Sequence, residues 1–308
     1  MVQNDPCYAL PLVRYITLRA FLFKDFIRGP GMIQLERVHL RYHPLESLMD
    51  LSCKRCFVFD LDGTVYMGNK PIPGTVNFIR RNLERFDIHF LTNNTSKNLT
   101  DYVAKLRGMG INATLPRMLS PLIPLAEKLE VEGIKEIYPV GNTNFLAYLS
   151  ERLPHLRFGK SADCGAVVVG YDTELTYEKL KDSCLLLQRP EVRFWATHPD
   201  DVCPSPAGPL PDTGSFLALY EKATKRRPEY IFGKPSTLIV EPLLKHYKRE
   251  EMVMVGDRLY TDKIMAENAG IDFILVLSGE SKQEDLAQLE RQPTLVLEDL
   301  GKLASCNQ

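Results

Sequence analysis

The stretch "FVFDLDGTVYMGN" at residues 57–69 puts two carboxylates, Asp60 and Asp62, directly after an apolar run. The apolar run is typical of a buried strand, and Gly63 permits the chain to turn after it. A carboxylate at the end of a buried strand costs free energy unless a charged group pairs with it. A turn or a helix cap would also explain this motif alone, so any partner has to be sought in the rest of the chain.

The composition of the chain is that of an ordinary globular protein. Its 308 residues, of which 44% are hydrophobic and 25% charged, suffice for one large domain or two moderate ones. The formal net charge of −1 provides no overall attraction to nucleic acid or to an anionic membrane. No apolar run approaches the ~20 residues that cross a bilayer, so neither nucleic acid nor a membrane is expected as a partner.

Seven cysteines are scattered along the chain, and their number is odd. Few and scattered cysteines are typical of a reducing compartment, and we expect the protein in the cytoplasm. Cys53 and Cys56 have the CxxC spacing of some zinc and redox sites. Because no second CxxC accompanies them, we favour a structural role over a zinc or redox site: the two cysteines are small residues that lead into a buried strand.

Residues 1–49 form an N-terminal extension that we assign to no domain. Its apolar stretch at 11–27 is interrupted by Arg14, Arg19 and Asp25, and it lacks the basic start and cleavage pattern of a signal peptide. Three interpretations of this segment stay open: a simple extension, a docking helix, and a translation start at Met32 instead of Met1.

From about residue 55 the chain alternates between short apolar runs and helical stretches. Apolar strands that alternate with helices predict an α/β fold with parallel sheets covered on both faces. The expected strands are 56–60, 88–92, 136–140, 166–171, 193–197, 230–233, 252–257, 273–277 and 294–299. The expected helices are 77–86, 99–110, 177–188, 215–227 and 261–270.

Four of the expected strands end next to polar residues that suit chemistry. These residues are Asp60, the run Thr92-Asn93-Asn94, Lys234 and Asp257. The carboxyl ends of parallel strands gather at one edge of a sheet, where α/β proteins bind ligands. There Asp60 can act as a covalent nucleophile and Asp62 as a general acid and base.

The hydroxyl, amide and ammonium groups at these strand ends suit an anion. Thr92 and the backbone N–H groups at the start of the next helix can hold phosphate oxygens, and Lys234 can pair with a phosphoryl group. A plain N-cap for the Asn residues and a surface position for Lys234 are the alternatives.

A divalent cation would account for the acidic groups. Asp60, Asp62 and Asp257 would repel one another without a cation, and Mg²⁺ prefers carboxylate oxygens completed by water and phosphate. Asp262 follows Asp257 by five residues, and it could instead cap a helix. The sequence therefore predicts a site for Mg²⁺ and a phosphate ester.

In this order and spacing, the motifs resemble the haloacid dehalogenase (HAD) superfamily of phosphatases. The matching motifs are DLDGT (60–64), TNN (92–94), GKPS (233–236) and GDR...TD (256–262), and the resemblance spans roughly residues 55–300. The phrases DGTVYMGNKPIPG (62–74), VVVGYDTELTYEKL (167–180), ATHPD (196–200) and DTGSFL (212–217) resemble the NagD and nitrophenylphosphatase branch.

The resemblance implies a Rossmann-like parallel-sheet core with an inserted α/β cap. The core would comprise residues 50–132 and 229–308, and the cap residues 133–228. The resemblance also implies a role for each matching residue. Asp60 would be the nucleophile and Asp62 the acid and base, and Mg²⁺ would be held by the carboxylates of Asp60 and Asp257 and the backbone carbonyl of Asp62. Thr92, Asn93, Asn94 and Lys234 would bind the phosphoryl group, with Asp262 in support.

The cap sequence departs from its relatives at two positions. Asp212 replaces a glycine of the relatives' PGTGS motif, and Cys203 stands where some pyridoxal-phosphatase-like relatives carry a histidine. An acidic residue near the ester would disfavour anionic leaving groups, which favours sugars or neutral alcohols. If Cys203 faces the site, the substrate contact that the histidine makes in those relatives is missing here. The alternative is a loop cysteine without a role.

We therefore expect a Mg²⁺-dependent phosphatase that hydrolyses small phosphomonoesters such as sugar phosphates, nucleoside monophosphates and p-nitrophenyl phosphate. A phosphatase for phosphoglycolate or pyridoxal phosphate is the alternative within the branch, and a non-catalytic binding protein is the alternative outside it. The partner would be a small phosphorylated metabolite. Relatives often dimerise through the cap, so a homodimer is also open.

Overall fold

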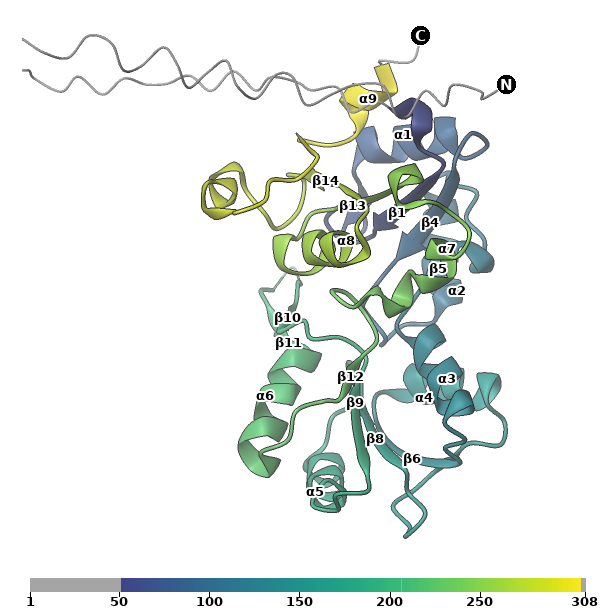
Figure 1. Ribbon diagram of the computed structural model, residues 1–308, viewed down its shortest axis with the longest axis vertical. Coiled ribbons are helices and arrows are strands. Elements are labelled where there is room, and N and C mark those ends of the chain that lie inside the picture. Colours follow the sequence, from purple (N-terminus) through teal and green to yellow (C-terminus); the bar gives the residue numbers. More distant parts are fainter. Residues whose placement is uncertain (1–50, 206, 306–308) are drawn as a thin grey trace, which may run out of the picture. The chain divides into compact units, whose positions relative to one another are not determined.

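The computed structural model describes residues 51–205 and 207–305, and Figure 1 shows their arrangement. The predictions for residues 1–49, including the alternative start at Met32, lie outside the described residues. Cys53 lies in a short 3₁₀ turn, and Cys56 is the buried first residue of a strand. No helix of the described residues is long and apolar enough to span a membrane.

A six-stranded parallel sheet, which we name the core sheet, carries the strands whose ends hold the predicted site. Its order is β15 (Leu295–Leu297), β14 (Asp272–Val276), β13 (Met252–Gly256), β1 (Cys56–Asp60), β4 (Asp87–Leu91) and β5 (Met118–Leu119). In the register, Val58 of β1 pairs with Met254 of β13 on one side and His89 of β4 on the other. Every residue of β1 and β13 is buried, because helices cover both faces of the sheet.

Side chains that alternate along β1 divide the core into two layers. Phe57 and Phe59 face α1 (Pro73–Asn82), α2 (Leu99–Gly108) and α9 (Gly301–Ser305), whereas Val58 faces α7 (Glu241–Leu244) and α8 (Ile264–Ala269). The Phe57 ring lies 5.6 Å from that of Phe78 and 4.7 Å from that of Phe86. This aromatic packing anchors the strand that ends in Asp60.

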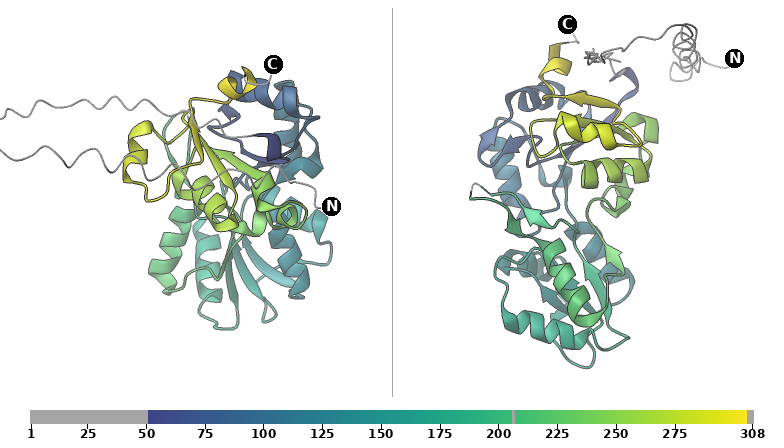
Figure 2. Two further views of the ribbon diagram at one scale, coloured as in Figure 1. Left: turned by 45° about the horizontal axis from the view of Figure 1, so that its top comes forward. Right: turned by 90° about the vertical axis from the view of Figure 1, so that its left-hand side faces the viewer.

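A second parallel sheet is built from the middle of the chain. Its order is β12 (Tyr230–Ile231), β9 (Arg193–Ala196), β8 (Ala166–Val169), β6 (Glu136–Val140) and β7 (Arg157–Phe158). Helices α3 (Leu122–Val131) and α4 (Thr143–Arg152) pack on one face, and α5 (Tyr177–Leu186) and α6 (Thr213–Thr224) pack on the other (Figures 1 and 2). Two parallel sheets covered on both faces confirm the predicted α/β class.

The predicted domain boundaries stay a prediction, and two elements near them pack with the second sheet. Helix α3 precedes the expected boundary at 132/133, yet its apolar side chains pack against Ile137 and Trp195 of that sheet. Strand β12 follows the boundary at 228/229 and pairs with β9 in the same sheet.

Two short antiparallel pairs approach the carboxyl ends of the core strands. One joins β2 (Tyr66–Met67) to β3 (Lys70–Pro71), and the other joins β10 (Val202–Cys203) to β11 (Leu210–Pro211). The turn between β1 and β2 requires Gly63, whose φ is +89°. A Cβ atom there would lie 2.3 Å from Oδ2 of Asp257, so both the backbone conformation and the space favour glycine.

Candidate active site

A cavity of about 320 Å³ opens at the carboxyl ends of β1 and β4. Its walls on the core side include Asp60, Asp62, Thr92, Asn93, Asn94 and Lys234, and its walls on the opposite side include Asp200, Cys203 and Asp212. All the predicted site residues except Asp257 and Asp262 therefore line one cavity. Its volume is at the lower end of the range for small-molecule sites.

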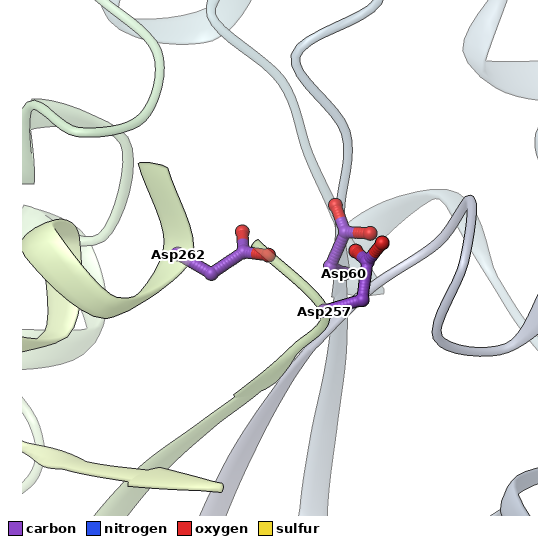
Figure 3. Close-up of side chains that lie close together, drawn as sticks. All are labelled: Asp60, Asp257 and Asp262. Carbon is purple, nitrogen blue, oxygen red and sulfur yellow. The ribbon is translucent and has the colours of Figure 1, made fainter. Parts of the chain in front are cut away.

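Asp257 and Asp262 lie beside Asp60 and complete a carboxylate cluster (Figure 3). Asp60 ends β1, Asp257 directly follows β13, and Asp262 lies in a π-helical turn at Leu259–Lys263. One carboxylate oxygen from each of the three lies within 4.8 Å of the others. Burial raises the pKa of Asp60 well above its usual range, and Asp262 and Asp257 add to this effect although Lys234 opposes it.

Asp257 has one oxygen held by the protein and one free. Its Oδ2 accepts a hydrogen bond of 2.7 Å from the backbone N–H of Glu280, whereas its Oδ1 is buried without a partner among the described residues. Burial and the neighbouring Asp262 raise the pKa of Asp257 to about 7. A buried, unpartnered carboxylate oxygen beside two further carboxylates fits a hard divalent cation such as Mg²⁺.

Lys234 is buried between two of these carboxylates. Its ammonium donates to Oδ1 of Asp60 and lies 2.6 Å from Oδ1 of Asp262. Burial alone would lower the pKa of Lys234, but Asp262 and Asp60 outweigh it, and the pKa is raised above its usual value. Lys234 is therefore a fixed cation at the floor of the cavity, and Asp262 holds it there.

Asp62 lies apart from the carboxylate cluster, on the cavity wall. Its side chain is accessible to solvent through the cavity, but protein atoms surround it on the other sides. This partial desolvation raises the pKa of Asp62, although the positive charges of Lys105, Lys97 and Arg258 oppose the rise. A carboxyl with a raised pKa can hold a proton at a higher pH than an ordinary aspartate, which suits a general acid.

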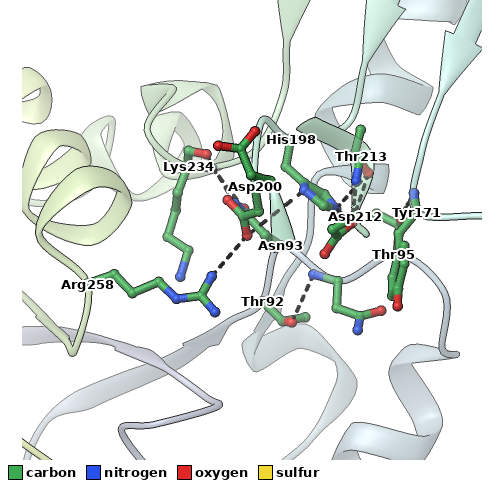
Figure 4. Close-up of polar contacts among 12 residues, drawn as sticks. Thr92, Asn93, Thr95, Tyr171, His198, Asp200, Asp212, Thr213, Lys234 and Arg258 are labelled. Carbon is green, nitrogen blue, oxygen red and sulfur yellow. Dashed lines mark hydrogen bonds and ion pairs between the residues drawn. The ribbon is translucent and has the colours of Figure 1, made fainter. Parts of the chain in front are cut away.

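The three residues after β4 have different contacts (Figure 4). The Thr92 hydroxyl accepts a 3.2 Å hydrogen bond from the backbone N–H of Asn94. The side-chain oxygen Oδ1 of Asn94 in turn accepts hydrogen bonds from the backbone N–H and the hydroxyl of Ser96. Asn93 accepts from the backbone N–H of Lys234 at 2.9 Å and donates to the Lys234 carbonyl at 3.0 Å. The Asn93 side chain thereby fixes the backbone that carries Lys234.

Asp200 and Arg258 were not predicted from the sequence, although both stand in motifs that the sequence analysis quoted. The Asp200 carboxylate accepts from Nδ2 of Asn93 at 3.1 Å and from Nη1 of Arg258 at 3.2 Å (Figure 4). Nε of Arg258 also lies 3.0 Å from Oε2 of Glu280. Because Asp200 follows β9 and its partners follow β4 and β13, it ties the second sheet to the site.

Asp212 and Cys203 both line the cavity. Asp212 is the N-cap of α6, where Oδ1 accepts a 2.6 Å hydrogen bond from the Thr213 N–H, and it lies 3.6 Å from Nε2 of buried His198. Burial raises the pKa of Asp212, although His198 opposes the rise. Burial likewise raises the pKa of the Cys203 thiol, and Asp212 adds to this effect.

The pKa of Asp257 predicts how Mg²⁺ should affect thermal stability. The pKa near 7 in the folded protein exceeds the unfolded value of about 3.9. The folded state then binds more protons between these values, so this group's contribution to the unfolding free energy falls as the pH rises through that window. Because Mg²⁺ would bind the ionised carboxylates, we expect the increase in Tm on adding Mg²⁺ to be larger at about pH 8 than at about pH 5.5.

Scanning calorimetry with and without MgCl₂ at both pH values measures this difference. Comparing the increase rather than Tm itself removes the effect of other titrating groups. An equal increase at both pH values would contradict the prediction.

Two family models match the chain. One, described as haloacid dehalogenase-like hydrolase, matches residues 57–152, and another, described as HAD-hydrolase-like, matches residues 231–303. The two matched segments contain Asp60 at the end of β1, Thr92 directly after β4 and Asp257 directly after β13.

Known proteins resemble the chain over most of its length. The acid sugar phosphatase of Staphylococcus epidermidis is 32% identical over 251 residues, which are 80% of this chain and 95% of the relative. The 5′-nucleotidase YutF of Bacillus subtilis is 32% identical over 249 residues, which are 79% of this chain and 95% of the relative. The crystal structure of the 4-nitrophenylphosphatase of Thermotoga maritima superposes with a TM-score of 0.77 at 38% identity, covering 84% of this chain and 99% of that one. The chain therefore belongs to the haloacid dehalogenase-like hydrolases, in the branch of NagD and the 4-nitrophenylphosphatases, and it is a phosphoric monoester hydrolase.

Proposed function

We propose that the protein is a Mg²⁺-dependent phosphatase that hydrolyses small phosphomonoesters through an aspartyl-phosphate on Asp60. The observation that carries this proposal is the cluster at the floor of the cavity. It combines the buried carboxylate of Asp60, a buried ammonium from Lys234 and a carboxylate oxygen of Asp257 that has no partner among the described residues. A structural ion pair would need only the first two of these groups.

In the first step, Asp60 attacks the phosphorus atom and the bond from phosphorus to the leaving oxygen breaks. Asp62 gives its proton to the leaving oxygen, so the product leaves as a neutral alcohol. In the second step, Asp62 takes a proton from water, the water oxygen attacks phosphorus, and the bond to Asp60 breaks. The products are inorganic phosphate and the free enzyme with Asp62 protonated again.

Positioning and charge neutralisation supply most of the catalysis in phosphoryl transfer. Lys234 would offset the charge of the phosphoryl oxygens, and Thr92 and Asn94 would bind those oxygens from the end of β4. Asn93 would act through its bonds to the Lys234 backbone. Mg²⁺, held by Asp60, Asp257 and the backbone carbonyl of Asp62, would neutralise the charge that builds up on the phosphoryl oxygens, with Asp262 fixing Lys234.

The substrate range is proposed from the cavity and from the relatives' names. A cavity of about 320 Å³ suits a small phosphorylated metabolite. The relatives carry the names of a sugar phosphatase, a nucleotidase and a nitrophenylphosphatase, so the fold by itself does not select one substrate. We propose residues 133–228 as the cap that makes this selection, and the cytoplasm as the location.

Phosphate release from a panel of esters tests the proposal. The panel holds p-nitrophenyl phosphate, sugar phosphates, nucleoside monophosphates, phosphoglycolate and pyridoxal phosphate, each with Mg²⁺ and with a chelator. We expect turnover that requires Mg²⁺, and the ranking of the esters identifies the preferred leaving group. Folded, Mg²⁺-loaded protein that hydrolyses none of them would favour the non-catalytic binding protein instead.

A further inference from the structure

The ionic groups that line the cavity are matched by partners within the protein, with three exceptions. Lys234 pairs with Asp60 and Asp262, while Arg258 pairs with Asp200 and Glu280. Asp212 faces His198. The exceptions are Asp62, Lys97 and Lys105, none of which has an oppositely charged group within 4.0 Å among the described residues. The cavity therefore keeps two ammonium groups and one carboxyl for its ligand.

Lys105 is held in place although no counterion lies within 4.0 Å of it among the described residues. It extends from α2, and its ammonium lies 3.3 Å from the centre of the ring of Tyr66, which is fully buried in β2. A cation over an aromatic face is attracted to it but keeps its full charge. Burial lowers the pKa of Lys105, and Lys97 lowers it further, while Asp62 opposes both effects. Lys97 and Lys105 thus place two ammonium groups on the wall of the same cavity.

The two lysines lie on the leaving-group side of the site. Both line the same cavity as Asp62, which would protonate the leaving oxygen, and Tyr66, whose ring lies under the Lys105 ammonium, forms a β-bridge with Asp62. The transferred phosphoryl group would instead meet Lys234 and the carboxylate cluster at the floor of the cavity. A negative charge beyond the leaving oxygen would reach Lys97 and Lys105 without competing with the transferred group.

We propose that Lys97 and Lys105 bind a second anionic group, a carboxylate or a phosphate, on the leaving group of the substrate. This inference rests on the proposed phosphatase function and narrows its substrate class to phosphomonoesters with a further negative charge. This proposal is opposite to the expectation from the sequence, in which the negative charge of Asp212 disfavours anionic leaving groups. Asp212 lies across the cavity, where the Thr213 N–H and His198 already engage its carboxylate.

Binding of phosphonates tests the inference without turnover, because their C–P bond is not hydrolysed. Titration calorimetry on the Mg²⁺-loaded full chain compares 3-phosphonopropionate with 3-hydroxypropylphosphonate, which carries a hydroxyl in place of the carboxylate. Propane-1,3-bisphosphonate adds a second phosphonate as the other anionic group. We expect the anionic ligands to bind about tenfold to hundredfold more tightly, the range for hydrogen bonds to a charged group.

The double variant Lys97→Gln/Lys105→Gln should reduce this ratio of Kd values by about tenfold or more. The double variant Lys97→Arg/Lys105→Arg keeps both charges and should keep most of the preference. Lys222→Gln, on the exposed surface of α6 away from the cavity, is the control for the loss of one lysine charge.

The outcomes separate this inference from the proposed function. A wild-type Kd ratio near one, or a ratio that the glutamine variant leaves unchanged, would overturn the inference. Equal weakening of both ligands would also overturn it, because the lysines would then serve the transferred group. Absent turnover of every ester, with a preserved Kd ratio, would overturn the phosphatase function and leave the anion site standing. The relative affinities of the carboxylate and bisphosphonate ligands identify which anion the pair prefers.

Discussion

Replacing Asp60 with Asn is expected to lower kcat for p-nitrophenyl phosphate by roughly 10⁴-fold or more, the scale seen when a covalent nucleophile is removed. The amide keeps the shape of the side chain at the end of β1, but it cannot form the bond to phosphorus. The fold should persist, because Lys234 keeps its ion pair with Asp262. Phosphate release and Tm, both measured on the purified variant, check the two statements.

Asp62→Asn is the informative comparison for this variant. Because p-nitrophenolate leaves without needing a proton, loss of Asp62 should slow the hydrolysis of p-nitrophenyl phosphate less than that of an alkyl phosphate. Loss of Asp60 should slow both esters equally. Asp60→Asn protein that retains wild-type kcat would refute the covalent role, and a lowered kcat with a collapsed Tm would assign the loss to unfolding.

Replacing Asp257 with Asn is expected to weaken Mg²⁺ binding and to lower kcat/KM by roughly 10²-fold or more, by analogy with the loss of a group that stabilises the transition-state charge. The Asn carbonyl oxygen can still accept the hydrogen bond from the Glu280 N–H, so local structure should be kept. The variant loses the charge and the free oxygen that fit a cation. Calorimetric titration with MgCl₂ measures the binding directly.

The matched control is Asp299→Asn. Asp299 also accepts hydrogen bonds from backbone N–H groups, at Gly74 and Gly301, but it does not belong to the carboxylate cluster that Asp257 forms with Asp60 and Asp262. Its replacement should leave Mg²⁺ affinity as it is. If Asp257→Asn bound Mg²⁺ as tightly as the wild type, the cation would have to be held elsewhere and the proposed metal site would be wrong.

Much of both sheets could be predicted from the sequence, because most of their longer strands are buried and appear as apolar runs. The predicted strand at 56–60 coincides with β1, and that at 136–140 coincides with β6. The two-residue strands β5 and β7 were missed because two residues show no periodicity, whereas the two-residue strand β12 lies within the predicted strand at 230–233. Helix α3 was also missed, and it contains Pro124 within its first turn.

The convergence of the predicted site residues could likewise be expected from the sequence. Asp60 ends β1, and Thr92 and Asp257 directly follow β4 and β13. These three strands are neighbours in a parallel sheet, so the side chains meet at one edge. The predicted supporting role of Asp262 agrees with its ion pair with Lys234. The roles of these residues in catalysis stay predictions until the variants are measured.

The sequence by itself therefore determined the α/β class, the family and the edge of the sheet that carries the chemistry, because these depend on local periodicity and on residues at strand ends. Only the tertiary structure decided which distant groups share the cavity. Asp200 meets Asn93 across 107 positions of the chain, and Lys105 reaches the Tyr66 ring from another element. Such pairings depend on how helices and loops pack in three dimensions, and ionic partners within the cavity leave no local pattern in the sequence. The charged groups of the cavity that have no ion-pair partner among the described residues, on which we propose that substrate choice depends, are therefore apparent only in the three-dimensional structure.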